Sequence, residues 1–244
     1  MCYFDIHIHA LCQVDDGPKT NEEMFSLIDA AYADGVRAIC LTPHFHVGYF
    51  GDNTKKCELA FGELLDYVGK KYSDLKIMLG NELRYSEGCI PYLVTDQCKT
   101  MNQTKYVLVD FSETETERGI ARGLERLLSA GYLPILAHAE RYRALWGKLS
   151  FLSEYRSKGV KFQVDAQSLF GKFGFCTKRF AIQILKNRLA DFVSSDAHDT
   201  HSRPPGMDKA YRYIEKKCSK NYAQAVCFET AMRLLCAQEN EGEK

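Results

Sequence analysis

Most of the seven histidines in this chain lie in short clusters that also contain carboxylate residues. These clusters, with one acidic motif between them, are Asp5-Ile6-His7-Ile8-His9 with Asp15-Asp16-Gly17, Thr42-Pro43-His44-Phe45-His46, Gly80-Asn81-Glu82, Ala137-His138-Ala139-Glu140-Arg141 and Ser195-Asp196-Ala197-His198. Imidazole and carboxylate groups are ligands that zinc, manganese and iron prefer. Such cations lower the pKa of bound water and make hydroxide available near neutral pH. The residue types therefore predict a hydrolytic metalloenzyme.

Short apolar runs alternate with amphipathic segments along the sequence. The runs are rich in Val, Ile and Leu, which is typical of strands covered on both faces, as in a parallel sheet. The predicted strands are Tyr3–Ile8, Val36–Leu41, Lys76–Leu79, Tyr106–Asp110, Leu133–Ala137, Lys161–Val164 and Phe192–Ser194.

The segments between these strands predict helices with one apolar face. The first begins at the capping box Thr20-Asn21-Glu22-Glu23, buries Met24, Leu27, Ile28 and Ala31, and ends at Gly35; the second carries Ile120, Leu124, Leu127 and Leu128 and ends at Gly131; the third carries Met207, Ala210, Tyr211 and Ile214. No linker, repeat or low-complexity stretch interrupts the series. Seven successive β/α units predict an α/β fold of one domain over residues 1–244, closed or nearly closed into a barrel.

The candidate ligands share one position relative to the predicted strands. Each ends a strand or directly follows one; they are His7, His9, His44, Glu82, Asp110, His138, Asp196 and His198. Because a barrel builds its active site at the carboxyl ends of its strands, we expect these side chains to meet there.

Each motif alone also has an ordinary structural interpretation. A His-x-His pair can lie in a core, Glu82 in an exposed loop, and Asp196 at a helix cap. Asp16 with the following glycine can form a turn. Structural roles alone do not explain why all these residues choose one end of the same barrel, so we favour a metal site. His46 and His201 lie beside stronger candidates, and we expect them to be supporting or surface residues.

Arg141 and Arg203 also lie just after strand ends that carry ligands. Guanidinium groups bind phosphate through paired hydrogen bonds, and we favour this role for both arginines beside a metal cluster. The alternative is a surface salt bridge, such as one between Arg141 and Glu140.

Positive and negative side chains balance in this chain, with 32 Lys plus Arg and 32 Asp plus Glu. This balance argues against nucleic acid or an anionic membrane as the main partner. The start of the chain is too polar for a signal peptide, and no apolar run approaches the length of a membrane span. We therefore expect no membrane insertion and a cytoplasmic location.

The ten cysteines show no metal-binding or disulfide framework, and we expect reduced, mostly buried thiols. Cys227 and Arg233 do have the C-x5-R spacing of cysteine-dependent phosphatases. Those enzymes bind phosphate in a tight loop of backbone amides that usually contains glycine. The intervening residues here have no glycine and a helical pattern, so we interpret the spacing as a coincidence.

The order of the motifs D-x-H-x-H, D-D-G-P-K, T-P-H, G-x-E, H-x-E-R and S-D-x-H resembles the PHP (polymerase and histidinol phosphatase) superfamily. Within it, Asp5–His9, Asp15–Lys19 and Ser194–His198 are most similar to one branch. That branch contains the manganese-dependent bacterial protein-tyrosine phosphatases of capsule and exopolysaccharide gene clusters. The resemblance extends from Asp5 to about Leu235.

The resemblance implies a distorted (β/α)7 TIM-like barrel, the PHP fold, with two or three divalent metal ions. Manganese is expected, with iron or zinc as alternatives. The implied ligands are His7, His9, Glu82 and Asp196 for one ion, Glu82, Asp110 and His138 for a second, and Asp16, His44 and His198 for a third. Arg141 and Arg203 match the phosphate-binding arginines of the family.

Two positions depart from the pattern of the branch. Asp110 stands where glutamate is usual, and the carboxylate is shorter by one methylene. The second ion is therefore expected to be held loosely or through water. Ala139 replaces the proline that usually follows the histidine.

The resemblance further implies hydrolysis of protein phosphotyrosine by metal-activated hydroxide, with Arg141 and Arg203 as catalytic and substrate-binding residues. The implied partner is a membrane-associated bacterial tyrosine autokinase, which would make the protein a regulator of polysaccharide export. Two alternatives stay open: a small-molecule phosphatase such as histidinol-phosphatase, and a metal-binding regulator without turnover. The intact ligand set disfavours the regulator, and zero net charge disfavours a PHP nuclease or polymerase-editing domain.

Overall fold

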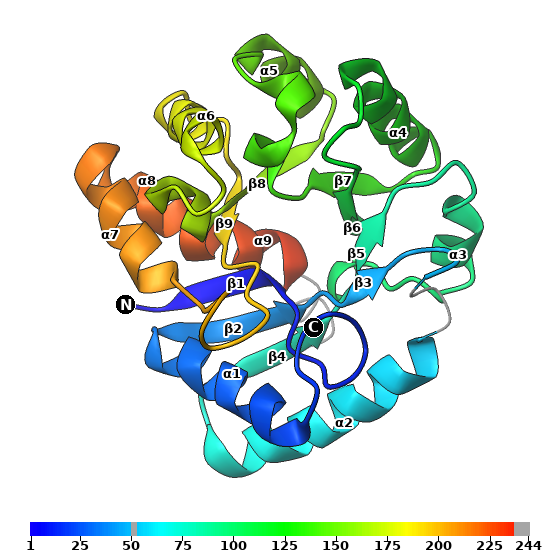
Figure 1. Cartoon of the computed structure of the whole chain (residues 1–244), viewed down its shortest axis with the longest axis vertical. Helices are drawn as coiled ribbons and strands as arrows, with labels where there is room; N and C mark the ends of the chain where they lie inside the picture. Colours follow the sequence, from blue (N-terminus) through cyan, green and yellow to red (C-terminus); the bar gives the residue numbers. More distant parts are fainter. Residues whose placement is uncertain (50–52, 237–244) are drawn as a thin grey trace, which may run out of the picture.

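Parallel strands form the centre of the computed structural model, and helices surround them (Figure 1). The structure describes residues 1–49 and 53–236. The strands are β1 Tyr3–Ile8, β2 Val36–Leu41, β3 His44–Phe45, β4 Lys76–Leu79, β5 Glu82–Arg84, β6 Tyr106–Asp110, β7 Leu133–Leu136, β8 Lys161–Asp165 and β9 Phe192–Ser194. The α-helices are α1 Asn21–Ala33, α2 Thr54–Lys71, α3 Ile90–Val94, α4 Glu117–Ser129, α5 Leu149–Ser157, α6 Phe175–Lys186, α7 Met207–Lys217, α8 Lys220–Gln224 and α9 Thr230–Leu235.

The strands curl so that the first and the last come together. One sheet has the order β1-β2-β4 and the other the order β3-β5-β6-β7-β8-β9, and all pairs are parallel. β3 continues the run of β2 after Thr42 and Pro43, and β5 continues β4 after Gly80 and Asn81. Pro43 has no N–H to donate, which explains a break in the ladder at that point. A bridge between Ile8 and Ala197 then joins β1 to the segment after β9, which confirms the predicted distorted (β/α)7 barrel.

The predicted elements agree closely with the observed ones. Each predicted strand is present, with β7 ending one residue earlier and β8 one residue later. The three predicted helices are α1, α4 and α7. Thr20 caps α1, since its Oγ1 accepts a hydrogen bond from the Glu23 amide at 3.2 Å. The Glu23 carboxylate returns to the amide of Lys19, at 2.6 Å, instead of that of Thr20.

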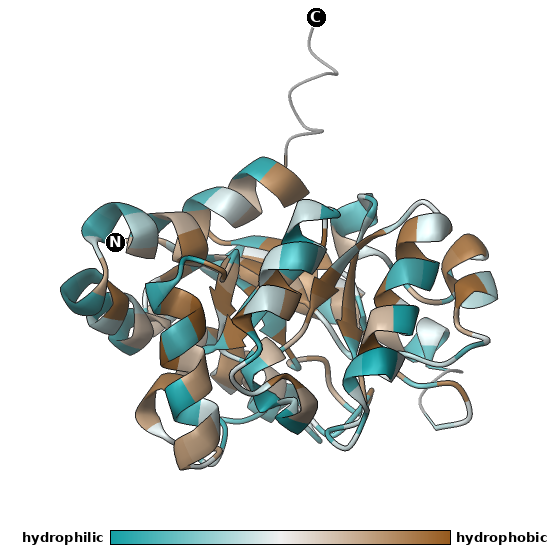
Figure 2. Cartoon of the chain, turned by 90° about the horizontal axis from the view of Figure 1, so that it is seen from above, coloured by the Kyte–Doolittle hydropathy of each residue, from teal (hydrophilic) through white to brown (hydrophobic). Residues whose placement is uncertain are grey.

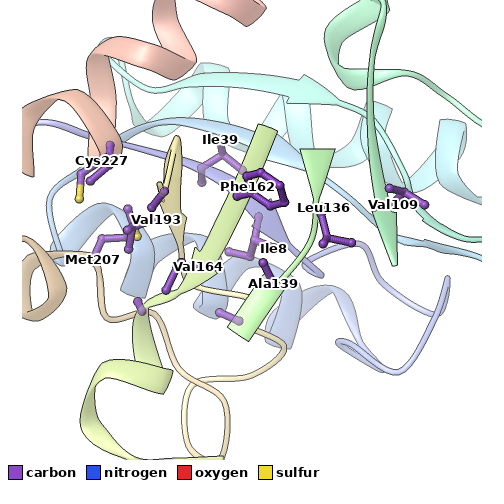
Figure 3. Packing of buried hydrophobic residues seen from close by; sticks show 14 of the residues in the cluster. Ile8, Ile39, Val109, Leu136, Ala139, Phe162, Val164, Val193, Met207 and Cys227 are labelled. Atoms are coloured by element: carbon purple, nitrogen blue, oxygen red, sulfur yellow. The ribbon is translucent and has the colours of Figure 1, made fainter. Parts of the chain in front are cut away.

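Two apolar clusters hold the strands and helices together. The larger one lies between the sheets and the helices and runs from Tyr3 to Cys227 in sequence; Figure 3 shows part of it, with Phe162, Val164 and Val193 on the strands. The smaller one combines Phe4 and Ile6 of β1 with residues of five other strands and with Leu235 of α9. In Figure 2 the central strands are mostly hydrophobic, whereas the helices carry both hydrophilic and hydrophobic positions.

Gly35, at the end of α1, offers a test of this packing. Its φ is +97°, and an added Cβ would lie 2.9 Å from Cε2 of Tyr3. Tyr3 cannot easily give way, because it is buried and its hydroxyl donates to Asp208 Oδ1 at 2.9 Å. We expect Gly35→Ala to lower the free energy of unfolding by about 2–4 kcal/mol, since backbone strain and overpacking add.

Gly131→Ala is the matched control. Gly131 has a φ of +88°, but an added Cβ would meet no atom within 4 Å. We expect this variant to lose only the strain, about 1–2 kcal/mol. Denaturant unfolding of both variants measures the difference, and equal losses would contradict the role assigned to Tyr3.

Candidate metal centre

The predicted ligands converge at the carboxyl ends of the strands. Three groups of potential ligands occur among residues 1–49 and 53–236, each with its ligand atoms within 4.8 Å of one another. The groups are His7, His9 and Glu82; Glu82, Asp110 and His138; and His9, Asp16, His44 and His198. Because Glu82 and His9 each belong to two groups, the three groups form one connected centre.

Hydrogen bonds on the outer side of His7 and His9 determine where their lone pairs point. The His138 amide donates to Gln163 Oε1 at 2.6 Å, which identifies that atom as oxygen. His7 Nδ1 lies 3.2 Å from the same oxygen and must therefore carry the proton. His9 Nδ1 lies 2.7 Å from Asp15 Oδ2 and likewise donates. When both rings are neutral, the Nε2 atoms of His7 and His9, which lie 3.1 Å apart, present lone pairs to the space between them.

Two carboxylates face the same point as these lone pairs. Glu82 Oε1 lies 3.4 Å from His7 Nε2, and Glu82 Oε2 lies 3.3 Å from His9 Nε2. Asp196 Oδ1 lies 3.4 Å and 3.5 Å from the two nitrogens. Ligands about 2.1 Å from one ion are about 3.0–3.4 Å apart for octahedral or tetrahedral angles. The four residues predicted for one ion therefore fit a cation between them.

The group around Asp16 follows the same logic. His198 Nδ1 lies 3.0 Å from the carbonyl oxygen of Asp196 and donates to it. Its Nε2 lone pair then faces Asp16 Oδ1 at 3.2 Å. His44 Nε2 lies 3.3 Å from the same oxygen, and His44 Nδ1 lies 2.7 Å from Glu82 Oε2. The structure thus brings together the three residues predicted for this site and adds His9 to them.

Asp110 reaches its group but is held from two sides. His138 Nε2 lies 3.0 Å from Glu82 Oε1 and 3.8 Å from Asp110 Oδ1. The Tyr142 hydroxyl donates to Asp110 Oδ1 at 2.9 Å, and Arg84 Nη2 lies 3.1 Å from Oδ2. Both oxygens of the short carboxylate therefore already have partners.

The pKa values of His7, His44 and Asp110 are shifted in the direction that favours bound positive charge. Burial lowers the pKa of His7, but the carboxylates of Glu82 and Asp196 outweigh it and raise the pKa to about 9. Burial likewise opposes a rise in the pKa of His44, which Glu82 and Asp16 bring to about 11. Burial and the neighbouring Glu82 raise the pKa of Asp110. A divalent cation bound here would supply the charge that these groups otherwise take from protons.

His198 differs from the other histidines. Burial and the nearby His9 lower its pKa to about 4, so the ring is neutral near pH 7. The histidines at 3.2–3.3 Å from Asp16 oppose its desolvation and hold the pKa of that carboxyl far below its usual range. A neutral nitrogen facing a carboxylate fits cation binding.

Both predicted arginines contact Asp196. Arg141 Nη2 and Arg203 Nη2 each lie 2.7 Å from Asp196 Oδ2, while Oδ1 faces the histidines. Arg141 also pairs with Asp165, and its guanidinium stacks 3.8 Å above the ring of Phe173. The alternative pair of Arg141 with Glu140 does not form. Glu140 is buried and instead accepts from Ser168 Oγ.

Two of the ligand positions have left-handed backbone conformations. His138 has a φ of +31° and Asp196 a φ of +51°. Such conformations cost free energy in non-glycine residues and persist where neighbouring groups over-determine them. Gln163 accepts from the His138 amide, and the His7 carbonyl accepts from the Asp196 amide at 2.8 Å. These bonds turn the chain sharply at the strand ends and aim both side chains into the centre.

Several residues of the centre were not singled out from the sequence. Asp15, Gln163 and Tyr142 orient His9, His7 and Asp110, and Asp165 pairs with Arg141. Gln163 and Asp165 lie on β8, from which we predicted no site residue. A polar residue inside this apolar strand, and a carboxylate at its carboxyl end, were signals that the sequence contained.

His46, His201 and Ala139 are not part of any ligand group among the described residues. His46 stacks on Tyr49 with 5.0 Å between ring centroids, and His201 is exposed. Ala139 is the first residue of a 3₁₀ turn, Ala139–Arg141, a position that accommodates proline or alanine.

The chain matches the family model described as "Capsular polysaccharide synthesis, CpsB/CapC" over residues 3–236. It is 34% identical over 236 residues to the tyrosine-protein phosphatase CpsB of Streptococcus agalactiae serotype V, covering 95% of this chain and 97% of the relative. It is 33% identical over 240 residues to CpsB of Streptococcus pneumoniae, covering 96% and 98%.

A solved structure is similar over the same length. It comes from work on YwqE of Bacillus subtilis and CpsB of Streptococcus pneumoniae, described as unique metal-dependent tyrosine phosphatases. The TM-score is 0.85 at 29% identity, covering 97% of this chain and 94% of the solved one. The fold is therefore shared over nearly the whole chain.

We predict that His198→Ala lowers the manganese content by about one ion per chain, because it removes a ligand that the Asp16 group requires. Elemental analysis after equilibration with manganese and desalting measures the content. His201→Ala is the matched control, because His201 is three residues away and exposed. Equal metal content in both variants would show that His198 is not a ligand.

A second prediction concerns Asp110→Glu. The side chain of glutamate is longer by one methylene, so its carboxylate can reach a cation beyond the hydrogen bonds with Tyr142 and Arg84. The manganese concentration for half-maximal activity should therefore fall about tenfold. A metal titration compares it with wild type and with Asp191→Glu, the same change at a buried aspartate that pairs with Arg156. An unchanged or higher metal requirement would mean that Asp110 is not a loose ligand.

Proposed function

Because this chain belongs to the CpsB/CapC family of capsular polysaccharide synthesis, we propose that it is a metal-dependent protein-tyrosine phosphatase. One observation carries the proposal beyond family membership. Asp196 faces His7 and His9 with one oxygen and both arginines with the other, so a cation and a phosphate would be bound side by side.

The residues divide into those that hold cations and those that hold the phosphate. We assign His7, His9, Glu82 and Asp196 to one ion, Glu82, Asp110 and His138 to a second, and His9, Asp16, His44 and His198 to a third. When bound, the cations supply a water of low pKa and neutralise charge on the phosphoryl oxygens. Manganese is the proposed ion, at two or three per chain, because the donors are imidazole nitrogens and carboxylate oxygens without thiolate.

Arg141 and Arg203 orient the substrate phosphate. Their side chains are 11% and 29% exposed, so both reach the barrel mouth while staying fixed by Asp196. Arg141 Nε has no hydrogen-bond partner among residues 1–49 and 53–236. Planar guanidinium groups hold phosphate oxygens through paired bonds and stabilise charge that develops during transfer.

No protein nucleophile is required, and Cys227 does not provide one. It lies in the π-helical segment Ala225–Glu229, which confirms the helical prediction for this region. Its side chain is buried in the apolar core beside Val193 (Figure 3), and burial raises the pKa of the thiol well above its usual value. A buried neutral thiol away from the arginines is inert.

The remaining assignments follow from this reaction. We infer that the physiological substrate is a phosphotyrosine protein and that the partner is a membrane-associated bacterial tyrosine autokinase of capsule or exopolysaccharide synthesis. Among the residues described, no helix is long and apolar enough to cross a membrane. We place the protein in the cytoplasm, where such a kinase presents its phosphotyrosines. One continuous core from Tyr3 to Cys227 supports a single functional domain.

The proposal predicts that manganese-loaded protein hydrolyses phosphotyrosine peptides with a kcat/KM at least about tenfold higher than for histidinol phosphate. A phosphate-release assay with both substrates side by side measures this ratio. A preference for histidinol phosphate would assign the protein to small-molecule phosphatases instead.

The same assay distinguishes the nucleophile. Chelator treatment should abolish turnover and added manganese should restore it, whereas Cys227→Ser should remain active because its thiol is buried. Inactive but folded Cys227→Ser protein, with chelator-resistant wild type, would indicate a cysteine mechanism.

A further inference from the structure

A hollow of about 430 Å³ lies between the segments that follow β8 and β9. Phe170, Pro204 and Pro205 form its apolar wall. Gln167 ties the two loops together, since its Nε2 donates to the carbonyl oxygen of Pro204 at 2.6 Å. The hollow is therefore a built feature with a defined shape.

The charge at this hollow is positive. Lys172 and Lys209 line it, and no carboxylate of the described residues does. The Lys209 ammonium lies 4.2 Å above the ring centroid of Phe170, at the apolar wall. Neither lysine forms an ion pair within residues 1–49 and 53–236, so both charges are available to a ligand.

Two residues that line the hollow are linked to the arginines. Pro204 directly follows Arg203 in the chain. The backbone amide of Gln167 donates to Asp165 Oδ1 at 2.7 Å, and Asp165 forms an ion pair with Arg141. An extended peptide advances about 3.3 Å per residue, so we expect a residue one to three positions from a phosphotyrosine at the arginines to reach this hollow.

A second hollow at the barrel mouth has the opposite charge. Asp16, Glu22, Glu23 and Asp199 line it, and no lysine or arginine does among the described residues. It has a volume of about 330 Å³ and shares Asp16 and His198 with the metal centre. Anionic groups are therefore repelled on this side and attracted at Lys172 and Lys209.

We propose that the hollow of Phe170, Pro204, Pro205, Lys172 and Lys209 is a specificity subsite for an anionic side chain with an apolar stem, flanking the phosphotyrosine of the substrate. Glutamate and a second phosphotyrosine share this chemistry. The inference rests on the proposed function and deepens it. Because the chain has no net charge, such a preference would come from local charges.

The test uses manganese-loaded, full-length protein and peptides with one hydrolysable phosphotyrosine. Each peptide carries Glu, a non-hydrolysable phosphotyrosine analogue, Ala or Lys at one position within three residues on either side. At 0.15 M salt we expect kcat/KM for the anionic peptides to exceed that for the Lys peptides by about 3- to 10-fold, on one side of the phosphotyrosine. The Glu and analogue arms distinguish the two sources of the anion.

The double variant Lys172→Glu with Lys209→Glu should lose or reverse this preference. The double variant Lys216→Glu with Lys217→Glu is the matched control, because it makes the same charge change at exposed positions about two turns further along α7. Para-nitrophenyl phosphate, which has no flanking residues, normalises the rates and reveals any general damage to the centre.

The outcomes separate the two proposals. A wild type that does not hydrolyse para-nitrophenyl phosphate or any peptide overturns the proposed function and this inference with it. Turnover with equal rates on anionic and Lys peptides overturns only the subsite, as does a preference that survives in the Lys172→Glu, Lys209→Glu variant. Loss of the preference in the Lys172→Glu, Lys209→Glu variant, but not in the Lys216→Glu, Lys217→Glu variant, supports it.

Discussion

The convergence of two ring nitrogens and two carboxylates on one buried point is the central constraint on this structure. His7 and His9 point their Nε2 atoms at each other at 3.1 Å, with carboxylate oxygens of Glu82 and Asp196 nearby. Such an arrangement is unfavourable by itself, because like partial charges meet in a buried space. It becomes favourable when a cation lies between the donors. The barrel must therefore supply enough rigidity to hold these groups together, and the closure of β1 onto the segment after β9 does so.

Asp196 connects the metal centre with the phosphate-binding side of the site. One of its oxygens faces the two histidines and the other receives Arg141 and Arg203. A single carboxylate thus holds two histidines on one side and two positively charged arginines on the other, a few ångströms apart. Its left-handed backbone and the bond from its amide to His7 make this position possible. The local strain is offset by two ion pairs, which is a common arrangement at functional sites.

Negative and positive side chains are also separated at the barrel mouth. The carboxylate-lined hollow lies beside Asp16 and His198, and the lysine-lined hollow lies beside Arg203. The total charge of the chain is zero, so the separation of charge at the mouth comes from the positions of a few residues. Charges placed in this way steer and orient a charged ligand more than they increase its affinity.

The sequence by itself determined the strands, the principal helices and the meeting of the candidate ligands at the strand ends, because apolar periodicity and parallel-strand geometry act locally and place strand ends at one edge. It also identified both arginines. It did not reveal that Gln163, Asp15 and Tyr142 orient the ligands, that Asp196 is shared, or that His9 belongs to two groups. These features depend on contacts between residues far apart in the chain, such as His7 with Gln163, and on which ring nitrogen holds the proton. Only the tertiary structure decides them, because hydrogen-bond partners across the barrel depend on ångström-scale distances that residue spacing does not contain.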